Sequence, residues 1–293
     1  MPRPPASRPP ASRPPASSPV LPRVLLDDGA IVAVDKPSGW LVHAEADRTS
    51  VLGWLRERET SRGGNPDAIL PVHRLDRDTS GVLLFARTAE VAAAMGDRFR
   101  EHALTKVYLA AVSPLPPARW QETHLLLRPL KMGQGEFMEV VRDGGQPADA
   151  EVEVLARGRR LGLVRVIPLQ GRKHQVRATL ASLGAPIAGD FLYGGALSKR
   201  LADRVLLHAR SLAFAHPNTG AHVLVKAPLP ADFKAALLAD ACSVPGDVDR
   251  RHRTEPEQRR KGATATLPNV AALARNAVQP QRTIPTQRVR PAK

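Results

Sequence analysis

The chain has 293 residues, enough for one large domain or two small ones, and its formal net charge of +15 at pH 7 predicts attraction to nucleic acid or to an anionic membrane surface. It has no run of about 18 apolar residues that could span a bilayer, and its start does not resemble a secretory signal. The single cysteine, Cys242, excludes an internal disulfide and cannot build a zinc site alone. We therefore expect a cytoplasmic protein without a structural metal.

The chain begins with a segment, residues 1–20, that is predicted to be a disordered tail rich in proline, arginine and serine. It repeats Arg-Pro-Pro-Ala-Ser three times between Arg3 and Ser17. Such a tract has little apolar surface to bury, and its prolines keep it extended.

Strand-like and helix-like segments then mix without a regular alternation. Alternation and β-branched content predict strands at 31–36, 81–86, 106–112, 150–155, 161–167, 211–215 and 222–227. Helices are predicted at 50–58, 89–102, 173–183 and 231–240. Thr88 is placed to cap the second helix and Gly184 to end the third. This mixture indicates an α+β fold with a large mixed, mainly antiparallel sheet flanked by helices.

The chain ends with residues 244–293, which are predicted to be a disordered basic tail. They hold eleven Lys and Arg against four Asp and Glu, with few large apolar side chains. The first tail carries +3 and the last +7, so +5 remains for residues 20–243. We expect one folded, still basic domain over residues 21–243. It contains neither Gly-x-Gly-x-x-Gly nor a P-loop, so a bound nucleotide cofactor is not expected.

The first motif whose residues could take part in catalysis is HRLDRDTSG, residues 73–81, directly before a predicted strand. Arg74 and Arg77 flank Asp76, and nearby positive charge favours an ionised carboxylate. A kinase catalytic loop is excluded, because no glycine-rich phosphate loop precedes the motif and no Asp-Phe-Gly follows. A surface loop with weak ion pairs is the alternative that this composition leaves open.

The second motif is GRKHQVRATLASLG, residues 171–184. Arg172, Lys173 and His174 gather at the start of the predicted helix, where the macrodipole disfavours cations. A bound phosphate would make this arrangement favourable. The alternative is an amphipathic helix with a basic outer face. Its apolar stripe would be Val176, Leu180 and Leu183.

Two aromatic-containing segments remain ambiguous. Tyr108, in the predicted strand 106–112, is either a core residue with a polar tip or a group that stacks and handles protons. Tyr193, in GDFLYGG, is predicted to be structural in a tight, Gly-flanked turn. DKPSGWLVH, residues 35–43, is a turn after a strand, and its Trp40 and His43 either line a cleft or pack.

Taken together, these motifs resemble, in content and order, the RluA family of RNA pseudouridine synthases. The resemblance runs from about residue 24 to 230. Lys173 stands where Thr, Ser or Arg is more usual, and Ala178-Thr179 replaces the common Val-His. Many relatives carry an N-terminal S4 RNA-binding domain, in whose place this chain has its proline repeat. The matching segments are DKPSGWLVH, HRLDRDTSGVLLFART, KVYLAAV, GRKHQVR with LGAPIAGDFLYGG, and LLHARSLAFAHPNTG with KAPLP.

The resemblance implies a large mixed sheet with a central active-site cleft, an RNA substrate, and neither cofactor nor metal. Asp76 would be the essential aspartate, Tyr108 the active-site tyrosine that stacks on the target base, and Arg177 the arginine that pairs with the aspartate. Arg74 would enter the RNA stack as the base leaves. The remaining candidate RNA contacts are Arg77, Arg172, Lys173 and His174.

The chemistry of this family fits the residues. Conversion of uridine to pseudouridine breaks the bond between N1 and C1′ and joins C5 to C1′, with no redox change and no added group. Glycoside hydrolysis uses two carboxylates, whereas this isomerisation can work with one. Asp76 could attack the sugar or remove a sugar proton, and both routes stay open. Base flipping costs a few kcal/mol, which arginine insertion and tyrosine stacking could offset.

Three other functions compete with this interpretation. An RNA-binding protein that has lost catalysis would lack Asp76, Tyr108 or Arg177, and all three are present. A hydrolase would use Asp76 together with Asp78. A purely electrostatic DNA-binding protein would explain the tails but not the ordered motifs, so we expect no DNA partner. The motifs do not distinguish ribosomal from transfer RNA, and a monomer is the default expectation.

Overall fold

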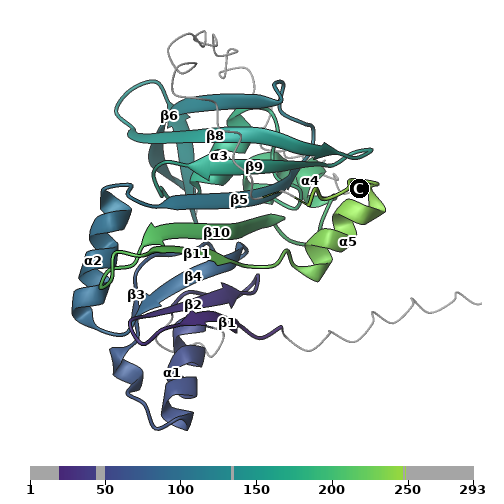
Figure 1. The fold of residues 1–293 in the computed structure, drawn as a ribbon. Coiled ribbons are helices and arrows are strands. Elements are labelled where there is room, and N and C mark those ends of the chain that lie inside the picture. Colours follow the sequence, from purple (N-terminus) through teal and green to yellow (C-terminus); the bar gives the residue numbers. More distant parts are fainter. Residues whose placement is uncertain (1–19, 44–49, 133–134, 247, 249–293) are drawn as a thin grey trace, which may run out of the picture.

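The computed structural model of the chain describes residues 20–43, 50–132, 135–246 and 248, and one sheet runs through this part (Figure 1). The strand order is β1-β2-β4-β10-β5-β9-β8-β6-β7, with β3 beside β4 and β11 beside β10. Neighbouring strands are antiparallel except β4 and β10, which are parallel. The predicted mixed, mainly antiparallel sheet is therefore confirmed. The strands are β1 (Arg23–Asp27), β2 (Ile31–Lys36), β3 (Leu70–Pro71), β4 (Ser80–Ala86), β5 (Thr105–Val112), β6 (Trp120–Met132), β7 (Gly135–Val141), β8 (Gln146–Arg157), β9 (Gly162–Pro168), β10 (Leu207–Ala215) and β11 (His222–Lys226).

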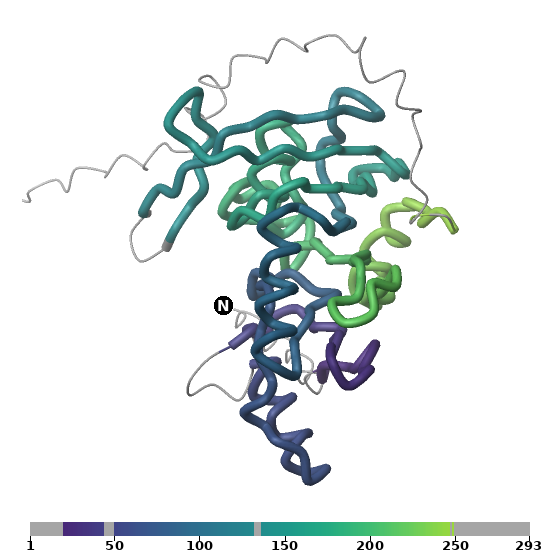
Figure 2. The backbone as a smooth tube through the Cα atoms, turned by 60° about the vertical axis from the view of Figure 1, so that its left-hand side comes forward, coloured from purple at the N-terminus to yellow at the C-terminus, as the bar shows by residue number. Residues whose placement is uncertain are grey.

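Helices flank this sheet. Figure 1 shows α3 behind β8 and β9, and α5 in front of the sheet at its right-hand end. Figure 2, turned by 60°, shows α2 alongside the middle of the sheet and α1 at its lower end. The helices are α1 (Val51–Ser61), the short 3-10 helix η1 (Pro66–Ala68), α2 (Ala89–Arg100), α3 (Gln175–Ser182), α4 (Phe191–Lys199) and α5 (Ala231–Ala239). No helix in the described ranges is both long and apolar enough to cross a bilayer.

The segments with a clear periodicity or cap have the predicted type. Each of the seven predicted strands and four predicted helices overlaps an observed one. The Thr88 hydroxyl accepts a hydrogen bond from Val91 N at the start of α2, as predicted. Gly184 follows α3 with φ +70°, a left-handed conformation that glycine adopts readily. The caps therefore fix these helix ends locally.

The prediction for GDFLYGG was wrong, because Tyr193 lies in α4 and not in a tight turn. Asp190 caps this helix by accepting a hydrogen bond from Tyr193 N at 3.3 Å. The two glycines made the segment look like a turn, and Gly195 does break the helical geometry with φ +62° and ψ −158°. Strands β1, β3, β6 and β7 were not predicted, and β6 contains Pro129, a residue that argues against a strand inside a sheet. This proline lies beyond Leu127, the last β6 residue paired with β8, so its missing N–H costs no bond there.

The parallel contact between β4 and β10 joins the two halves of the sheet. A Cβ atom on Gly81, which has φ +112°, would lie 2.2 Å from the Ala209 carbonyl oxygen of β10. Glycine is therefore required where the two backbones approach. Beside it, Ser80 Oγ lies 3.0 Å from Nδ1 of the buried His208. The Ser-Gly pair at the end of HRLDRDTSG thus fixes the start of β4, and with it the loop before β4.

The core is built from buried apolar side chains on both sides of the sheet. Val176 and Leu180 of α3 pack with the buried residues of β5, β8 and β9, as the predicted stripe requires. Val248 is also buried in this cluster, so packing continues past the predicted domain boundary at residue 243. The predicted tails, residues 1–20 and 244–293, otherwise lie outside the described residues, apart from 20 and 244–246.

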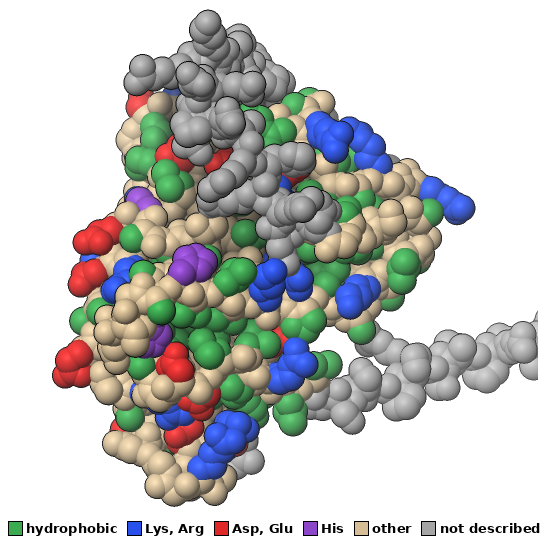
Figure 3. Space-filling view, in the orientation of Figure 1, with side chains coloured by type: hydrophobic (Ala, Val, Ile, Leu, Met, Phe, Trp, Pro, Cys, Tyr) green, Lys and Arg blue, Asp and Glu red, His purple; other side chains and the backbone are tan. Residues whose placement is uncertain are grey.

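The charge on the surface is unevenly distributed. On the face that Figure 3 shows, Lys and Arg side chains lie mainly toward the right-hand side, near β8, β9 and α5. Asp and Glu side chains lie mainly toward the left-hand side of the same view. This face, turned away from α3, therefore does not present a uniformly basic surface.

Candidate active site

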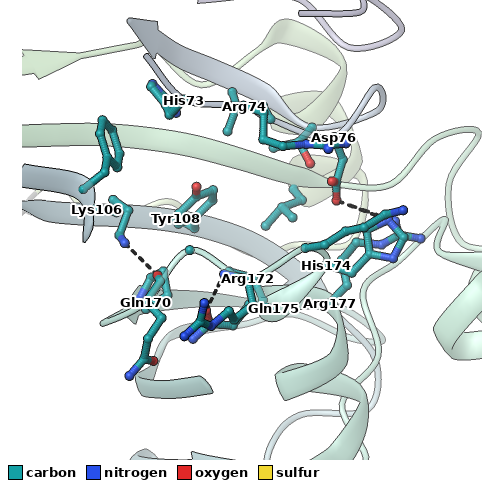
Figure 4. A pocket seen from close by; sticks show the side chains of 18 of the residues that line it. His73, Arg74, Asp76, Lys106, Tyr108, Gln170, Arg172, His174, Gln175 and Arg177 are labelled. Carbon is teal, nitrogen blue, oxygen red and sulfur yellow. Dashed lines mark hydrogen bonds and ion pairs between the residues drawn. The ribbon is translucent and has the colours of Figure 1, made fainter. Parts of the chain in front are cut away.

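A cleft of about 420 Å³ lies over the middle of the sheet. Three segments line most of it: the loop before β4, the end of α2 with the start of β5, and the connection from β9 into α3. Figure 4 shows Asp76, His174 and Arg177 at one end of the cleft, Lys106 and Gln170 at the other, and Tyr108 between them. The expected central cleft is confirmed. HRLDRDTSG and GRKHQVR, about a hundred residues apart in sequence, meet across it.

Asp76 is held by a tightly bonded loop. It starts a turn in which its carbonyl accepts a hydrogen bond from Thr79 N at 3.1 Å. The fully buried Lys36, at the end of β2, donates from Nζ to the carbonyls of Arg77 and Thr79 at 2.8 and 2.7 Å. Burial lowers the pKa of Lys36 to about 7, although Asp78 and Asp76 oppose the shift. Ser38 Oγ donates to the Asp78 carbonyl at 2.8 Å. The DKPSG turn therefore clamps the loop that carries Asp76.

Asp76 faces two basic side chains from the start of α3. Its Oδ2 lies 3.7 Å from Arg177 Nη1 and 3.8 Å from His174 Nε2. Arg177 also forms a two-pronged ion pair with the fully buried Asp190, at 2.7 and 2.8 Å. Burial alone would lower the pKa of Arg177, but the hydrogen bonds and charge of Asp190, with a smaller contribution from Asp76, raise it. Arg177 is thus a permanent cation fixed on one carboxylate and directed at another.

Tyr193 fixes the orientation of His174. Its hydroxyl oxygen accepts a hydrogen bond from Met138 N at 2.9 Å and lies 3.1 Å from His174 Nδ1. The tyrosine can therefore donate its own proton to Nδ1, which leaves the Nε2–H of a neutral His174 facing Asp76. Burial lowers the pKa of His174, and the charge of Asp76 only partly offsets this. The Tyr193 ring also lies 5.0 Å from Arg177 Cζ. Tyr193 therefore supports both side chains, in agreement with its predicted structural role.

Tyr108 projects from β5 into the cleft. Burial raises the pKa of its phenol well above the usual range, and the charge of Asp76 raises it further. The hydroxyl is therefore neutral at physiological pH, and it can donate or accept a hydrogen bond without carrying a charge. Its ring offers a flat apolar surface next to Asp76.

The predicted RNA-binding residues do not all lie in the cleft. Among them, Arg77 is absent from the described lining, and its Nε donates to the Gly39 carbonyl at 3.1 Å. Lys173 lines the cleft but forms a close ion pair with Glu136 of β7. Helix α3 begins at Gln175, two residues later than predicted, with His174 as a left-handed N-cap (φ 53°). The others that line the cleft are Arg74, Arg172 and His174.

Sequence reasoning missed several residues that shape the cleft. Lys106 lies two residues before Tyr108 on β5, so the period of two could have placed both on the cleft face. Gln175 and Gln170 both bind the backbone of Asp149, at 3.0 and 2.6 Å, and so hold the connection from β9 to α3. Asp190 could have been found only as the helix cap after a glycine, and nothing in the sequence pairs it with Arg177.

The first residue of HRLDRDTSG has a structural role. His73 Nε2 accepts a hydrogen bond from Leu84 N of β4 at 2.9 Å, and its ring stacks on Phe99 at 4.8 Å. Burial lowers the pKa of His73 to about 4, so it is neutral at physiological pH. Shortly after β3, the His73 side chain therefore takes over the hydrogen bonding to β4 and holds the loop against that strand.

Comparisons with known proteins match this arrangement. The profile of the RNA pseudouridylate synthase family matches residues 30–182. The chain is 33% identical over 228 residues to ribosomal large subunit pseudouridine synthase C of Pasteurella multocida, a match that covers 74% of this chain and 67% of that protein. It is 33% identical over 241 residues to tRNA pseudouridine synthase C of Vibrio cholerae, covering 73% of this chain and 93% of the relative. The solved structure of human RNA pseudouridylate synthase domain containing 4 superposes with a TM-score of 0.63 at 25% identity, over 76% of this chain and 94% of that one.

Proposed function

We propose, from the premise that the chain belongs to the RNA pseudouridylate synthase family, that it isomerises a uridine of ribosomal or transfer RNA with Asp76 as the group that acts on the sugar. Both RNA classes are named for relatives, one from Pasteurella multocida for the ribosomal large subunit and one from Vibrio cholerae for tRNA. We place the reaction in the cytoplasm. We propose that it acts as a monomer.

The observation that carries the assignment of Asp76 is that, in the part of the chain that the structure describes, no second carboxylate lies beside it in the cleft. It is the only carboxylate among the described residues that line the cleft. Asp78, the second carboxylate that a hydrolase would need, is not among those residues, and its carbonyl is bound by Ser38. A pair of carboxylates is typical of glycoside hydrolysis, whereas one is enough when the base is kept and reattached.

The proposed reaction balances without an added group. The bond between C1′ and N1 breaks, the bond between C1′ and C5 forms, C5 loses a proton and N1 gains one. Asp76 acts on the sugar by attack at C1′ or by taking a sugar proton. Arg177 holds the carboxylate in place at 3.7 Å, and Tyr108 provides the ring on which the flipped base stacks. Its neutral hydroxyl can hydrogen-bond to the base but is not basic enough to take the proton that C5 releases, so that proton passes to the Asp76 carboxylate or to solvent.

RNA binding is assigned to the basic side chains around the cleft. Arg74 is exposed at the cleft, and we assign it to the space that the flipped base leaves in the RNA stack. Arg172 and Lys173 lie at the opposite wall and are assigned to phosphates. Because Arg77 is bound to Gly39, its contribution would be to hold the loop that carries Asp76 and not to contact RNA directly.

The test is pseudouridine mapping of total RNA from cells with and without the gene, by carbodiimide modification and sequencing. We expect one or more sites to disappear, to return with the wild-type gene, and to remain absent with Asp76→Asn. Asp78→Asn is the matched control, because it removes a charge two residues away and should restore the site. If Asp76→Asn also restores the modification, the assignment of the aspartate is wrong. If no site disappears while purified protein binds RNA, the non-catalytic RNA-binding alternative gains support.

A further inference from the structure

The end of the cleft opposite Asp76 contains a buried cation that the proposed reaction does not use. Lys106 is only 7% exposed, yet it lines the cleft. Its Nζ donates to the carbonyls of Leu169 and Gln170 at 3.1 and 2.6 Å. No carboxylate forms an ion pair with it within the part of the chain that the structure describes. An ammonium has three donors, so two carbonyls leave one N–H and the whole positive charge without compensation.

Burial of such a charge is unfavourable unless a counter-ion is supplied. Two neutral carbonyls satisfy hydrogen bonds but do not neutralise the charge. Burial lowers the pKa of Lys106 to about 8, as expected for an ammonium without an acidic partner, and the side chain still carries its proton at neutral pH. The structure therefore holds a cation at the wall of the cleft where an anion would be stabilised.

Of the other cations that line the cleft, Arg74 is exposed to solvent and three are already paired with carboxylates. Arg100 is bound to Asp97, Lys173 to Glu136, and Arg177 to Asp190. Arg172, by contrast, has Nε bound to the carbonyl of Pro147, and among the described residues it makes no ion pair with a carboxylate. Lys106 and Arg172 are linked through the backbone, because Lys106 binds the carbonyl of Gln170 just before Gly171-Arg172. Both therefore belong to one wall of the cleft.

We propose that Lys106 and Arg172 form a subsite for a phosphodiester of the substrate RNA, beside the nucleotide whose base stacks on Tyr108. The proposal rests on the proposed function, since it needs the target uridine to occupy the end of the cleft with Asp76. A phosphate matches better than a uracil carbonyl, because two uncompensated positive charges require an anion and a neutral oxygen supplies none. Lys106 is then both an RNA contact and the anchor of the segment that carries Arg172.

The experiment measures binding of RNA oligonucleotides in an Asp76→Asn background, where no turnover interferes. Each phosphodiester around the mapped uridine is replaced, one at a time, by a neutral methylphosphonate. We expect one linkage next to the target whose neutralisation weakens binding by at least about tenfold. Lys106→Met should weaken binding to a similar extent and lower the slope of log affinity against log salt by about 0.7. In Lys106→Met, neutralisation of the same linkage should cost no further affinity.

Controls separate a lost contact from a lost fold. Lys234→Met removes the same charge from an exposed position on α5 and should leave both the slope and the sensitive linkage unchanged. If thermal unfolding shows that Lys106→Met is not folded, Arg172→Gln replaces it in the same cycle. Penalties that add independently in every combination would overturn the subsite. The subsite would also be overturned if, in the Asp76→Asn protein with Lys106 and Arg172 intact, neutralisation of no single linkage weakened binding. In that case Lys106 would contact the base instead of a phosphate.

The outcome also differs from a failure of the proposed function. If the protein with Asp76 intact does not form pseudouridine in the mapped RNA, the proposed function itself fails. If pseudouridine forms but no linkage couples to Lys106 or Arg172, only the phosphate subsite is wrong.

Discussion

At the scale of single residues, Arg177 connects two carboxylates with different surroundings. Asp190 is fully buried, whereas Asp76 faces the cleft, and the same guanidinium serves both. A bidentate pair with Asp190 leaves the third nitrogen directed at Asp76, which lysine could not reproduce with a single ammonium. The residue is therefore structural and functional at once, and its two roles can be separated.

We predict that Arg177→Met destabilises the protein by about 3 kcal/mol, because it leaves the buried Asp190 without its cation. The double variant Arg177→Met/Asp190→Asn should recover most of this loss, since the uncompensated charge is removed with it. Turnover should stay abolished in both variants. Urea denaturation and a single-turnover assay measure the two effects. Recovery of turnover in the double variant would show that Asp76 does not need Arg177.

At the scale of elements, the strand pair β4 and β10 depends on a histidine that must stay neutral. His208 is fully buried between Ser80 Oγ at 3.0 Å and the Ala227 carbonyl at 3.3 Å. Because the carbonyl can only accept a hydrogen bond, Nε2 must carry the ring proton. Nδ1 then accepts a hydrogen bond from the Ser80 hydroxyl. Burial lowers the pKa of His208 to about 4. The contact that fixes the start of β4, and so the position of Asp76, therefore excludes the charged imidazolium.

This shift predicts a pH-dependent stability. In the unfolded chain His208 takes up a proton near pH 6.5, whereas in the folded chain it does so only near pH 4. The unfolded state thus binds more protons between these values, and stability falls as the pH drops from 6.5 to 4. We expect His208 to contribute a loss of about 2 kcal/mol between pH 7 and pH 5. His73, with the same shift, should add to it, and Asp35, whose pKa burial raises to about 6, should oppose it.

The measurement is urea denaturation at pH 7 and pH 5 for the wild type and His208→Asn, which can keep a hydrogen bond to Ser80. The difference in stability between the two pH values should be smaller in the variant by about 2 kcal/mol. An equal difference in both proteins would mean that His208 is not held neutral. If His208→Asn does not fold, His73→Gln gives the same comparison, since a glutamine oxygen can still accept from Leu84 N.

At the scale of the whole molecule, sequence reasoning succeeded where the signal was local and failed where it was not. The period of two in IVAVDK and the cap at Thr88 gave β2 and α2 directly. The contacts of Lys36 with the carbonyls of Arg77 and Thr79 join residues 41 and 43 positions apart, and no local sequence pattern predicts them. The motif HRLDRDTSG marked Asp76 as special, but the clamp that holds it became visible only in three dimensions.

The contribution of the basic terminal segment to RNA binding is also a property of the whole molecule. Residues 249–293 hold eleven Lys and Arg against three Asp and Glu, whereas Val248, just before them, is buried in the core. We predict that truncation after Val248 leaves turnover at saturating RNA unchanged, because every lining residue of the cleft is retained. RNA affinity should fall and its salt dependence should become shallower, since fewer phosphates are neutralised.

The measurement that tests this prediction is RNA binding from low to high salt. A chain of full length whose eleven basic residues are changed to glutamine separates charge from length. If that chain keeps the wild-type salt slope, the terminal segment does not contact RNA, and the charge that binds it lies around the cleft.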